Sequence, residues 1–411
     1  MLRLKEVIIS ITNRCNLKCK MCDIPVNLME ELDTFQWKQV IEEASLIGAE
    51  TIVFSGGEPL LREDIFELIT AAKDNRMNAC LTSNGYLLDE KAAGKLAASG
   101  VNVVNVSLEG PEEIHNYLRG QGTFKRAVKA LENLRKYGVE STIAVMVSKH
   151  NYNSMPYIVE LAKKYGASTI RFQPFSVIFM DNESLKSSFF INKKQIKKVE
   201  AIFEKVIELS KKYKISTNPT NYLRAIPFYL SGKKIAFRNG CNALWTSCPI
   251  NACGDIFPCW AIIDKKKQIG NVGKNSFFEL WYSREHSGIR ELIVDEGCRS
   301  CMMSCYDGVF GQNREEKYFL NLFRKIKNIS AQKLIDKLTR YLRKRTVQLK
   351  LRCKFYNSYR GSFRNIFNRI FKNVQRKMSV RNINNKGQIE KSLEEISLLK
   401  KRLNKEIAKL K

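Results

Sequence analysis

The chain has 411 residues, enough for two domains or for one large domain with additions. It carries 70 Lys and Arg against 41 Asp and Glu, a formal net charge of +29 at pH 7, but residues 311–411 alone hold 29 of the basic and 7 of the acidic residues. Because the excess charge belongs to this carboxyl-terminal part, it does not indicate that the whole protein binds nucleic acid. No run of about 18 or more apolar residues occurs, which argues against a membrane-spanning helix.

The sequence contains 12 cysteines. Its first residues lack the apolar region and the small-residue cleavage site of a signal peptide. In a chain without a secretory signal, this many cysteines is typical of metal ligation in a reducing compartment rather than of a disulfide framework. We therefore predict a cytoplasmic, metal-binding protein.

The first predicted strand, residues 6–11, leads into three cysteines spaced as C-x3-C-x2-C: Cys15, Cys19 and Cys22. A structural zinc site and a four-cysteine iron–sulfur site both close every metal position. Three thiolates around a four-iron cluster would leave one iron open, and an open metal position can bind a substrate or a cofactor. A zinc knuckle completed by a ligand from elsewhere is the alternative.

Strand and helix patterns alternate over the first 175 residues or so. Such alternation predicts a parallel sheet with right-handed crossovers and ligands at the carboxyl ends of its strands, here an α/β fold with an open, partial (β/α)6 barrel. Strands are expected at 6–11, 51–54, 79–82, 102–107, 140–147 and 168–173, with helices at 34–47, 63–75, 90–99 and 123–137 among them. Residues 193–213 then predict one long helix, and 214–240 a connector.

Several of these strands end in short polar motifs. Residues 51–54 run into Ser55-Gly56-Gly57-Glu58-Pro59, where paired glycines allow a backbone to approach a ligand closely. Thr82-Ser83-Asn84-Gly85 and Ser107-Leu108-Glu109-Gly110 follow later strands, and residues 115–120 come next. In this order after the cysteine triplet, the motifs resemble the radical S-adenosylmethionine (SAM) superfamily over about residues 5–175.

The resemblance implies an activity and two partners. In that family the triplet loop holds a 4Fe–4S cluster, whose unique iron chelates the amino and carboxylate groups of SAM. One electron, from a donor such as flavodoxin or ferredoxin, cleaves SAM to methionine and a 5′-deoxyadenosyl radical, which abstracts hydrogen from a substrate. The protein supplies binding and orientation.

The resemblance also implies seven contacts with SAM, and no residue is given a catalytic role. The contacts divide among the methionine end, the ribose or carboxylate, and the adenine. Gly56, Gly57 and Glu58 are expected at the methionine end. Asn84, Ser107 and the cation Arg119, which can bind a carboxylate bidentately, are expected at the ribose or carboxylate, and Met21 at the adenine. The scattered histidines, His115, His150 and His286, are assigned no role.

A second group of seven cysteines lies within 65 residues: Cys241, Cys248, Cys253, Cys259, Cys298, Cys301 and Cys305. Their spacing partly resembles the SPASM/twitch extension of radical SAM enzymes, which holds auxiliary 4Fe–4S clusters. We predict one auxiliary cluster on Cys241, Cys259, Cys298 and Cys301, in which Cys248 or Cys305 could replace one ligand. A zinc ribbon is the alternative. Outside both groups, Cys80 is expected in the core and Cys353 is an isolated thiol.

The remaining residues form a basic tail. Residues 318–342 and 363–374 show apolar residues at helical spacing among Lys and Arg, a pattern that can lie on an anionic membrane surface, here the inner membrane. Packing of these helices on the barrel is the alternative. Residues 388–411 show a short heptad pattern.

These observations predict three parts and several functions. Residues 1–215 form the barrel, 216–312 a small cysteine-rich auxiliary-cluster domain, and 313–411 a basic helical tail. The leading hypothesis is a maturase-like enzyme that acts on a peptide or protein side chain. The alternatives are an enzyme for a small-molecule or membrane-associated intermediate and, in a different class, a non-catalytic metal-binding scaffold.

Overall fold

The computed structural model describes residues 4–26, 29–177, 187–233, 243–260, 262, 267–296 and 302–303. These belong to the first of two compact units, Met1–Gln312. The second unit, Asn313–Lys411, lies outside the described residues, so the basic helices, the heptad segment and the membrane contact of the tail remain predictions. In the described part of the chain, no helix is both long and apolar enough to cross a membrane.

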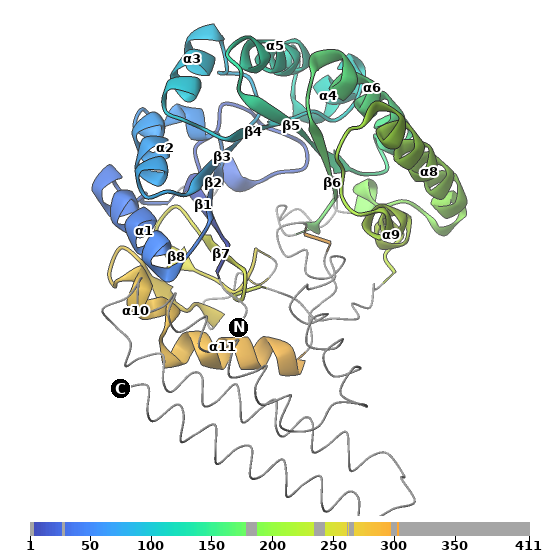
Figure 1. The fold of residues 1–411 in the computed structure, drawn as a ribbon. Helices are drawn as coiled ribbons and strands as arrows, with labels where there is room; N and C mark the ends of the chain where they lie inside the picture. The colour runs from blue at the N-terminus through green and yellow to red at the C-terminus, as the bar shows by residue number, and fades with distance from the viewer. Residues whose placement is uncertain are drawn as a thin grey trace, which may run out of the picture. The chain divides into compact units, whose positions relative to one another are not determined.

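Six parallel strands and the helices between them form the curved centre of the fold (Figure 1). The strands follow the chain order in the sheet and are β1 (Glu6–Thr12), β2 (Thr51–Gly56), β3 (Asn78–Ser83), β4 (Val103–Ser107), β5 (Glu140–Val147) and β6 (Thr169–Pro174). The helices lie on the convex side and are α1 (Thr34–Ile47), α2 (Ile65–Asp74), α3 (Glu90–Ala98), α4 (Glu112–Arg119), α5 (Thr123–Lys136) and α6 (Met155–Tyr165). The predicted partial barrel is confirmed.

The two faces of the sheet differ in burial. Successive side chains of a strand point to opposite faces. Ile52 and Phe54 of β2 and Val104 and Val106 of β4 are fully buried beneath the helices, whereas the residues between them are only half-buried. The helices therefore bury the convex face, and the concave face carries the half-buried side chains.

Cys80 lies on the concave face, and the expectation that it packs in the core is wrong. Its neighbours Ala79 and Leu81 are fully buried, whereas Cys80 is only half-buried. Partial burial still raises the pKa of its thiol to about 11, so the thiol stays protonated at neutral pH.

Helix boundaries follow local capping where the sequence provides it. Asp33 accepts a hydrogen bond from the backbone of Gln36, whose side chain bonds back to Asp33, and Gly48 ends α1 in the left-handed conformation. Residues 214–240 are not only a connector, because α9 (Thr220–Leu230) lies there and packs against α8 (Ile196–Tyr213). The prolines that mark this segment are tolerated because buried residues of α9 anchor it in the core.

The sheet continues into the cysteine-rich segment. Strand β7 (Ser247–Ile250) pairs in parallel with β1, and β8 (Asp255–Ile256) and β9 (Gly270–Asn271) add antiparallel strands beyond it. Two helices follow, α10 (Phe277–Trp281) and α11 (Arg284–Glu296). Glu43 of α1 accepts hydrogen bonds from the Ser276 hydroxyl and the Phe278 backbone, both at 2.9 Å, and so fixes the start of α10. Within the part of the chain that the structure describes, β1 is therefore an interior strand of a nine-stranded sheet.

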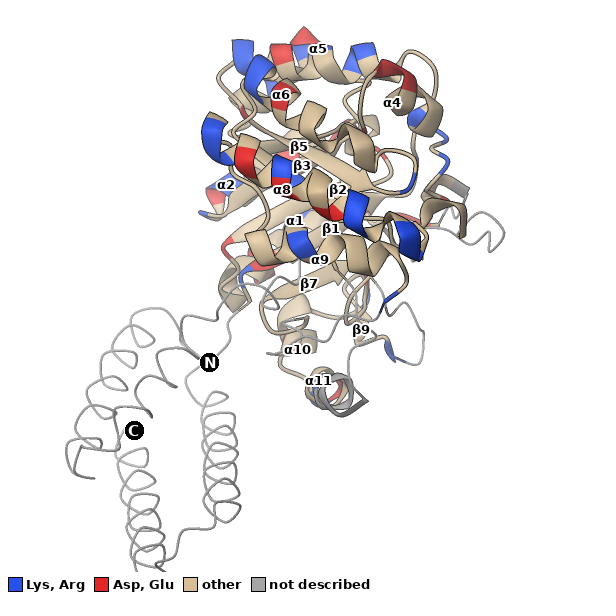
Figure 2. Ribbon diagram, turned by 90° about the vertical axis from the view of Figure 1, so that its right-hand side faces the viewer, with Lys and Arg blue, Asp and Glu red and all other residues tan. Residues whose placement is uncertain are grey.

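Charged side chains of both signs are mixed on the outer helices. Figure 2 shows Lys and Arg beside Asp and Glu on α5, α6 and α8, with no single-sign face over them. This distribution agrees with the sequence, in which most of the excess positive charge belongs to residues 311–411.

Candidate iron–sulfur and SAM site

The three cysteines of the C-x3-C-x2-C motif follow directly on β1 and lie close enough to influence one another. Cys15, Cys19 and Cys22 are half-buried, and burial raises the pKa of each thiol. The charge of another member of the triplet also raises the pKa of each thiol, and the positive charge of Arg119 opposes the rise for Cys19 and Cys22. Ligation by this loop must therefore displace a proton from each thiol.

No three His, Cys, Asp or Glu side chains in the described ranges come together closely enough to hold a single metal ion.

The paired glycines lie against the start of the cysteine loop. The Gly57 N–H donates to the Thr12 carbonyl at 2.7 Å, and the Glu58 N–H to the Arg14 carbonyl at 2.9 Å. A Cβ on Gly56 would lie 2.2 Å from the Thr12 oxygen, and one on Gly57 would lie 2.2 Å from the Arg14 oxygen. The loop backbone thus occupies the space of the missing side chains, which is a reason for glycine separate from any approach by a ligand.

Glu58 joins the glycine turn to the end of β3. Its fully buried carboxylate accepts hydrogen bonds from the Asn84 N–H at 2.8 Å, the Ser83 hydroxyl at 2.9 Å and the Leu60 N–H at 3.2 Å. Burial raises the pKa of Glu58 to about 7, although these hydrogen bonds oppose the rise. Glu58 therefore titrates near neutral pH.

Asn84 links this turn to the cysteine loop. Its amide nitrogen lies 2.8 Å from the Asn16 side-chain oxygen and 3.8 Å from the Cys15 sulfur. Two predicted cofactor-binding residues, Glu58 and Asn84, thus come together beside the first cysteine.

Arg119 forms a buried ion pair with Glu109. Its Nε lies 2.7 Å and one terminal nitrogen 2.6 Å from the same Glu109 oxygen, and the other oxygen accepts from the Met146 N–H at 2.9 Å. Glu109 is fully buried, and a buried carboxylate left without this partner would be strongly destabilising. Arg119, expected to meet a SAM carboxylate, thus already has a protein partner next to the cysteines.

Two further residues hold Glu109, and the sequence did not reveal them. The Nδ1 atom of His115 accepts the Glu109 N–H at 3.2 Å, and the Asn151 amide donates to the Glu109 carbonyl at 2.9 Å. Burial lowers the pKa of His115 to about 3, so the ring is neutral and can accept this bond. The contact between His115 and Glu109 had one signal in the sequence: His115 comes six residues after Glu109, which follows the end of a predicted strand.

Two other predicted contacts are also buried. Ser107 lies at the end of β4 and is 7% exposed. Met21 is also 7% exposed and packs in the main apolar core. Contacts of both with SAM remain predictions.

Only one of the four predicted auxiliary ligands is described. Cys259 follows β8 and is 4% exposed, whereas Cys241, Cys298 and Cys301 lie outside the described residues, as does Cys305. Cys259 and Ala243 form a small apolar cluster with Ile262 and Met303. In the sequence, Ala243 comes two residues after Cys241 and Met303 two residues after Cys301. The chain segments next to the predicted ligands therefore meet at Cys259.

The other described cysteines of this region have different surroundings. Cys248 lies in β7 opposite Val7 of β1, is fully buried, and belongs to the main core. Burial strongly raises the pKa of its thiol. Cys253 lies 3.2 Å from side-chain oxygens of both Asn251 and Asp255 in the β7–β8 turn. The apolar core around Cys248 and the polar turn around Cys253 account for both residues without a metal.

Comparison with known proteins agrees with this geometry. The family model described as the radical SAM superfamily matches residues 9–162, and that of an iron–sulfur cluster-binding domain, SPASM, matches residues 241–302. An AdoMet-dependent heme synthase of Methanosarcina barkeri is 30% identical over 303 residues, which are 67% of this chain and 81% of the relative. The chain belongs to the radical SAM superfamily. As in that family, its first domain binds a 4Fe–4S cluster and SAM, and its SPASM domain binds an iron–sulfur cluster.

Two further comparisons bear on this radical SAM enzyme. An Fe-coproporphyrin III synthase of M. barkeri is 35% identical over 162 residues, 38% of this chain and 41% of the relative. The structure of Streptococcus suis SuiB bound to SAM matches with a TM-score of 0.58 and 19% identity over 70% of this chain and 68% of that one. The structure of anSMEcpe with bound AdoMet matches with a TM-score of 0.57 and 21% identity over 73% and 88%. At these identities the two structures show the fold alone.

Burial of Glu58 predicts a pH-dependent stability. Its pKa is near 7 in the folded chain against an ordinary value of 4.5, so the folded state holds this proton more tightly and the resulting stability is lost as pH rises through 7. Between pH 5 and pH 8, we expect the free energy of unfolding of Glu58→Gln to rise by about 3 kcal/mol relative to that of the wild type. Urea unfolding of the cluster-free, reduced proteins across this range measures the difference. Parallel pH profiles for the two proteins would contradict the assignment.

Proposed function

We propose that this radical SAM enzyme binds its SAM-ligating cluster through Cys15, Cys19 and Cys22 and abstracts hydrogen from a small, carboxylate-bearing molecule. The observation that supports the first half most strongly is the single loop after β1 that carries three neighbouring, half-buried thiols against the Gly56-Gly57 turn. When bound, the cluster supplies the electron that cleaves SAM to methionine and a 5′-deoxyadenosyl radical.

The surrounding residues hold and orient SAM in this proposal. The backbone of Gly56 and Gly57 and the Asn84 amide contact the methionine end, since they adjoin the loop at Thr12 and Cys15. Glu58 acts through Asn84, whose backbone it fixes. The second terminal nitrogen of Arg119, which makes no hydrogen bond within the described residues, attracts the SAM carboxylate.

Two of the proposed contacts with SAM are supported only by the positions of their residues in the chain. Ser107, at the end of β4, is proposed for the ribose or carboxylate, and Met21, between two of the cysteines, for the adenine.

The auxiliary site is proposed as one 4Fe–4S cluster on Cys241, Cys259, Cys298 and Cys301. The packing of Ala243 and Met303 around Cys259 supports this set, because both are sequence neighbours of predicted ligands. The core position of Cys248 in β7 makes that cysteine a poor replacement. We also retain the boundaries 1–215, 216–312 and 313–411 as a proposed domain organisation.

A small-molecule substrate is favoured here over the peptide or protein side chain that was the leading hypothesis from the sequence. A relative that is 30% identical and covered over 81% of its length is named for heme synthesis, whereas the neighbours whose structures contain a bound peptide share the fold at 19–22% identity. On the concave face, Arg171 of β6 is exposed between the buried Ile170 and Phe172 and can pair with a carboxylate. A peptide or protein side chain is the second candidate, supported by that shared fold.

Iron content and SAM cleavage test the cysteine assignments. Anaerobically reconstituted wild type should hold about eight irons, four for each cluster. The triple variant Cys15→Ala, Cys19→Ala, Cys22→Ala should hold about four and form no 5′-deoxyadenosine with dithionite and SAM. A wild type with about four irons, all lost in the triple variant, would exclude the auxiliary cluster, and a triple variant that still cleaves SAM would exclude the first site.

Substrate binding separates the two candidates. We expect iron coproporphyrin III to bind with a shift of its Soret band and to raise 5′-deoxyadenosine formation, and Arg171→Ala to weaken binding roughly fivefold because an exposed charge pair is lost. Lys198→Ala, which changes an exposed cation of α8 outside the concave face, is the control. Absence of any Soret shift, together with stimulation by a cysteine-containing peptide, would favour the peptide candidate.

A further inference from the structure

Arg62 connects three segments of the chain around the cysteine loop. It follows the Gly56-Gly57-Glu58 turn closely and is only 8% exposed. Its Nε and one terminal nitrogen bind the two oxygens of Asp64 at 2.9 and 2.6 Å. The other terminal nitrogen donates to the carbonyls of Leu32 at 3.0 Å and Ile11 at 3.3 Å. One side chain thus binds the end of β1 and the segment that leads into α1.

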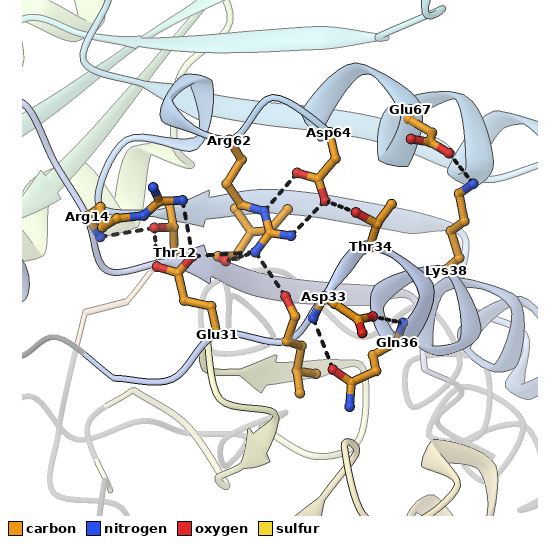
Figure 3. Close-up of polar contacts among 12 residues, drawn as sticks. Thr12, Arg14, Glu31, Asp33, Thr34, Gln36, Lys38, Arg62, Asp64 and Glu67 are labelled. Carbon is orange, nitrogen blue, oxygen red and sulfur yellow. Dashed lines mark hydrogen bonds and ion pairs between the residues drawn. The ribbon is translucent and has the colours of Figure 1, made fainter.

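Glu31 also joins the end of β1 to the segment that leads into α1. One carboxylate oxygen accepts from the Thr12 hydroxyl at 2.5 Å and the Asn13 N–H at 3.3 Å. The other lies 3.4 Å from the Arg14 guanidinium and 3.5 Å from that of Arg62 (Figure 3). Glu31, at the carboxyl end of the loop, is therefore bound to three residues at its amino end and to Arg62.

Together these contacts close the loop that carries the three cysteines. Thr12 to Arg14 begin the loop, and Glu31 and Leu32 end it just before the cap of α1. Fixing the two ends removes conformational freedom that the loop would otherwise lose when its cysteines bind a cluster. The buried cation between two carboxylates also satisfies main-chain oxygens that would be left without donors.

We propose that Arg62 and Glu31 form a clasp that holds the two ends of the cysteine loop together and so positions Cys15, Cys19 and Cys22 for cluster binding. Both are positioning residues, since they act through the loop backbone. The role requires arginine at position 62, because a planar fork with five N–H donors reaches Asp64 and two carbonyls at once, which the single ammonium of lysine does not. The inference rests on the proposed first cluster site.

The neighbouring ion pair of Lys38 and Glu67 provides a matched control. It joins α1 to α2 in the same region, is exposed, and makes no hydrogen bond or ion pair with the described residues of the cysteine loop (Figure 3). Loss of this pair removes one charge interaction without releasing either end of the loop.

The test compares full-length Arg62→Lys and Glu31→Gln with Lys38→Gln and the wild type. In reconstituted protein, we expect iron to leave the first site under a chelator at least roughly tenfold faster in Arg62→Lys and less so in Glu31→Gln, which keeps one acceptor for Thr12. Auxiliary iron and Lys38→Gln should follow the wild type. A changed electron paramagnetic resonance signal of the first cluster with SAM should accompany the effect.

Hydrogen exchange of the cluster-free chain tests the clasp independently of the cluster assignment. Backbone amides of residues 13–32 should exchange faster in both clasp variants, whereas those of β3 and β4 should not change. Unchanged exchange in the loop, or equal loss of iron from both sites, would overturn the clasp. A cysteine triple variant that keeps all of its iron would refute the first site instead, and the exchange result would still decide whether the clasp exists.

Discussion

The parallel pairing of β1 with β2 on one side and β7 on the other is the constraint on which the rest of this structure depends. β2 ends in the glycine turn, β1 ends at the cysteine loop, and β7 leads through a short turn to β8 and Cys259. Leu32 strengthens this arrangement, because its N–H donates to the Ala252 carbonyl at 2.9 Å while its carbonyl accepts from Arg62. The same strand therefore sets the cysteine loop and the SPASM hairpin relative to each other.

Around that strand, buried charges fix backbone positions. Glu58 holds the end of β3, Glu109 holds Arg119, and Arg62 holds both ends of the cysteine loop. Burying such groups costs free energy unless each is paired and hydrogen-bonded, and paired groups gain little net stability over apolar ones. Their value here lies in geometry, because each bond joins segments that are distant in the sequence and adjacent to the thiols. The proposed site presents three cysteines and several cofactor contacts at once, and such a site needs fixed distances.

Local signals predicted much of the fold, and long-range contacts account for what was missed. The bounds of α1 were predicted correctly from residues 34–47, since Asp33, Gln36 and Gly48 cap it locally. The helix α9 was missed because Pro219 and Pro227 indicate a connector, whereas its packing against α8 and β6 stabilises it. Arg62 and Glu31 gave no signal because most of their partners are distant in the sequence. Apart from Asp64, the partners of Arg62 lie about thirty or more residues away, and those of Glu31 lie about eighteen or more residues away. The cysteine triplet and its motifs were recognisable because one loop and a few strand ends contain them, whereas the pairing of Arg119 with Glu109 depends on how α4 returns to β4.

The central claim is that the loop after β1 binds the cluster that chelates SAM. Electron–nuclear double resonance of the reduced, reconstituted enzyme with SAM labelled with nitrogen-15 at its amino group tests this most directly. We expect a hyperfine coupling between that nitrogen and the cluster in the wild type, and none in the variant in which Cys15, Cys19 and Cys22 are replaced by Ala. A coupling that persists in the variant, or that is absent from a wild type with both clusters, would contradict it.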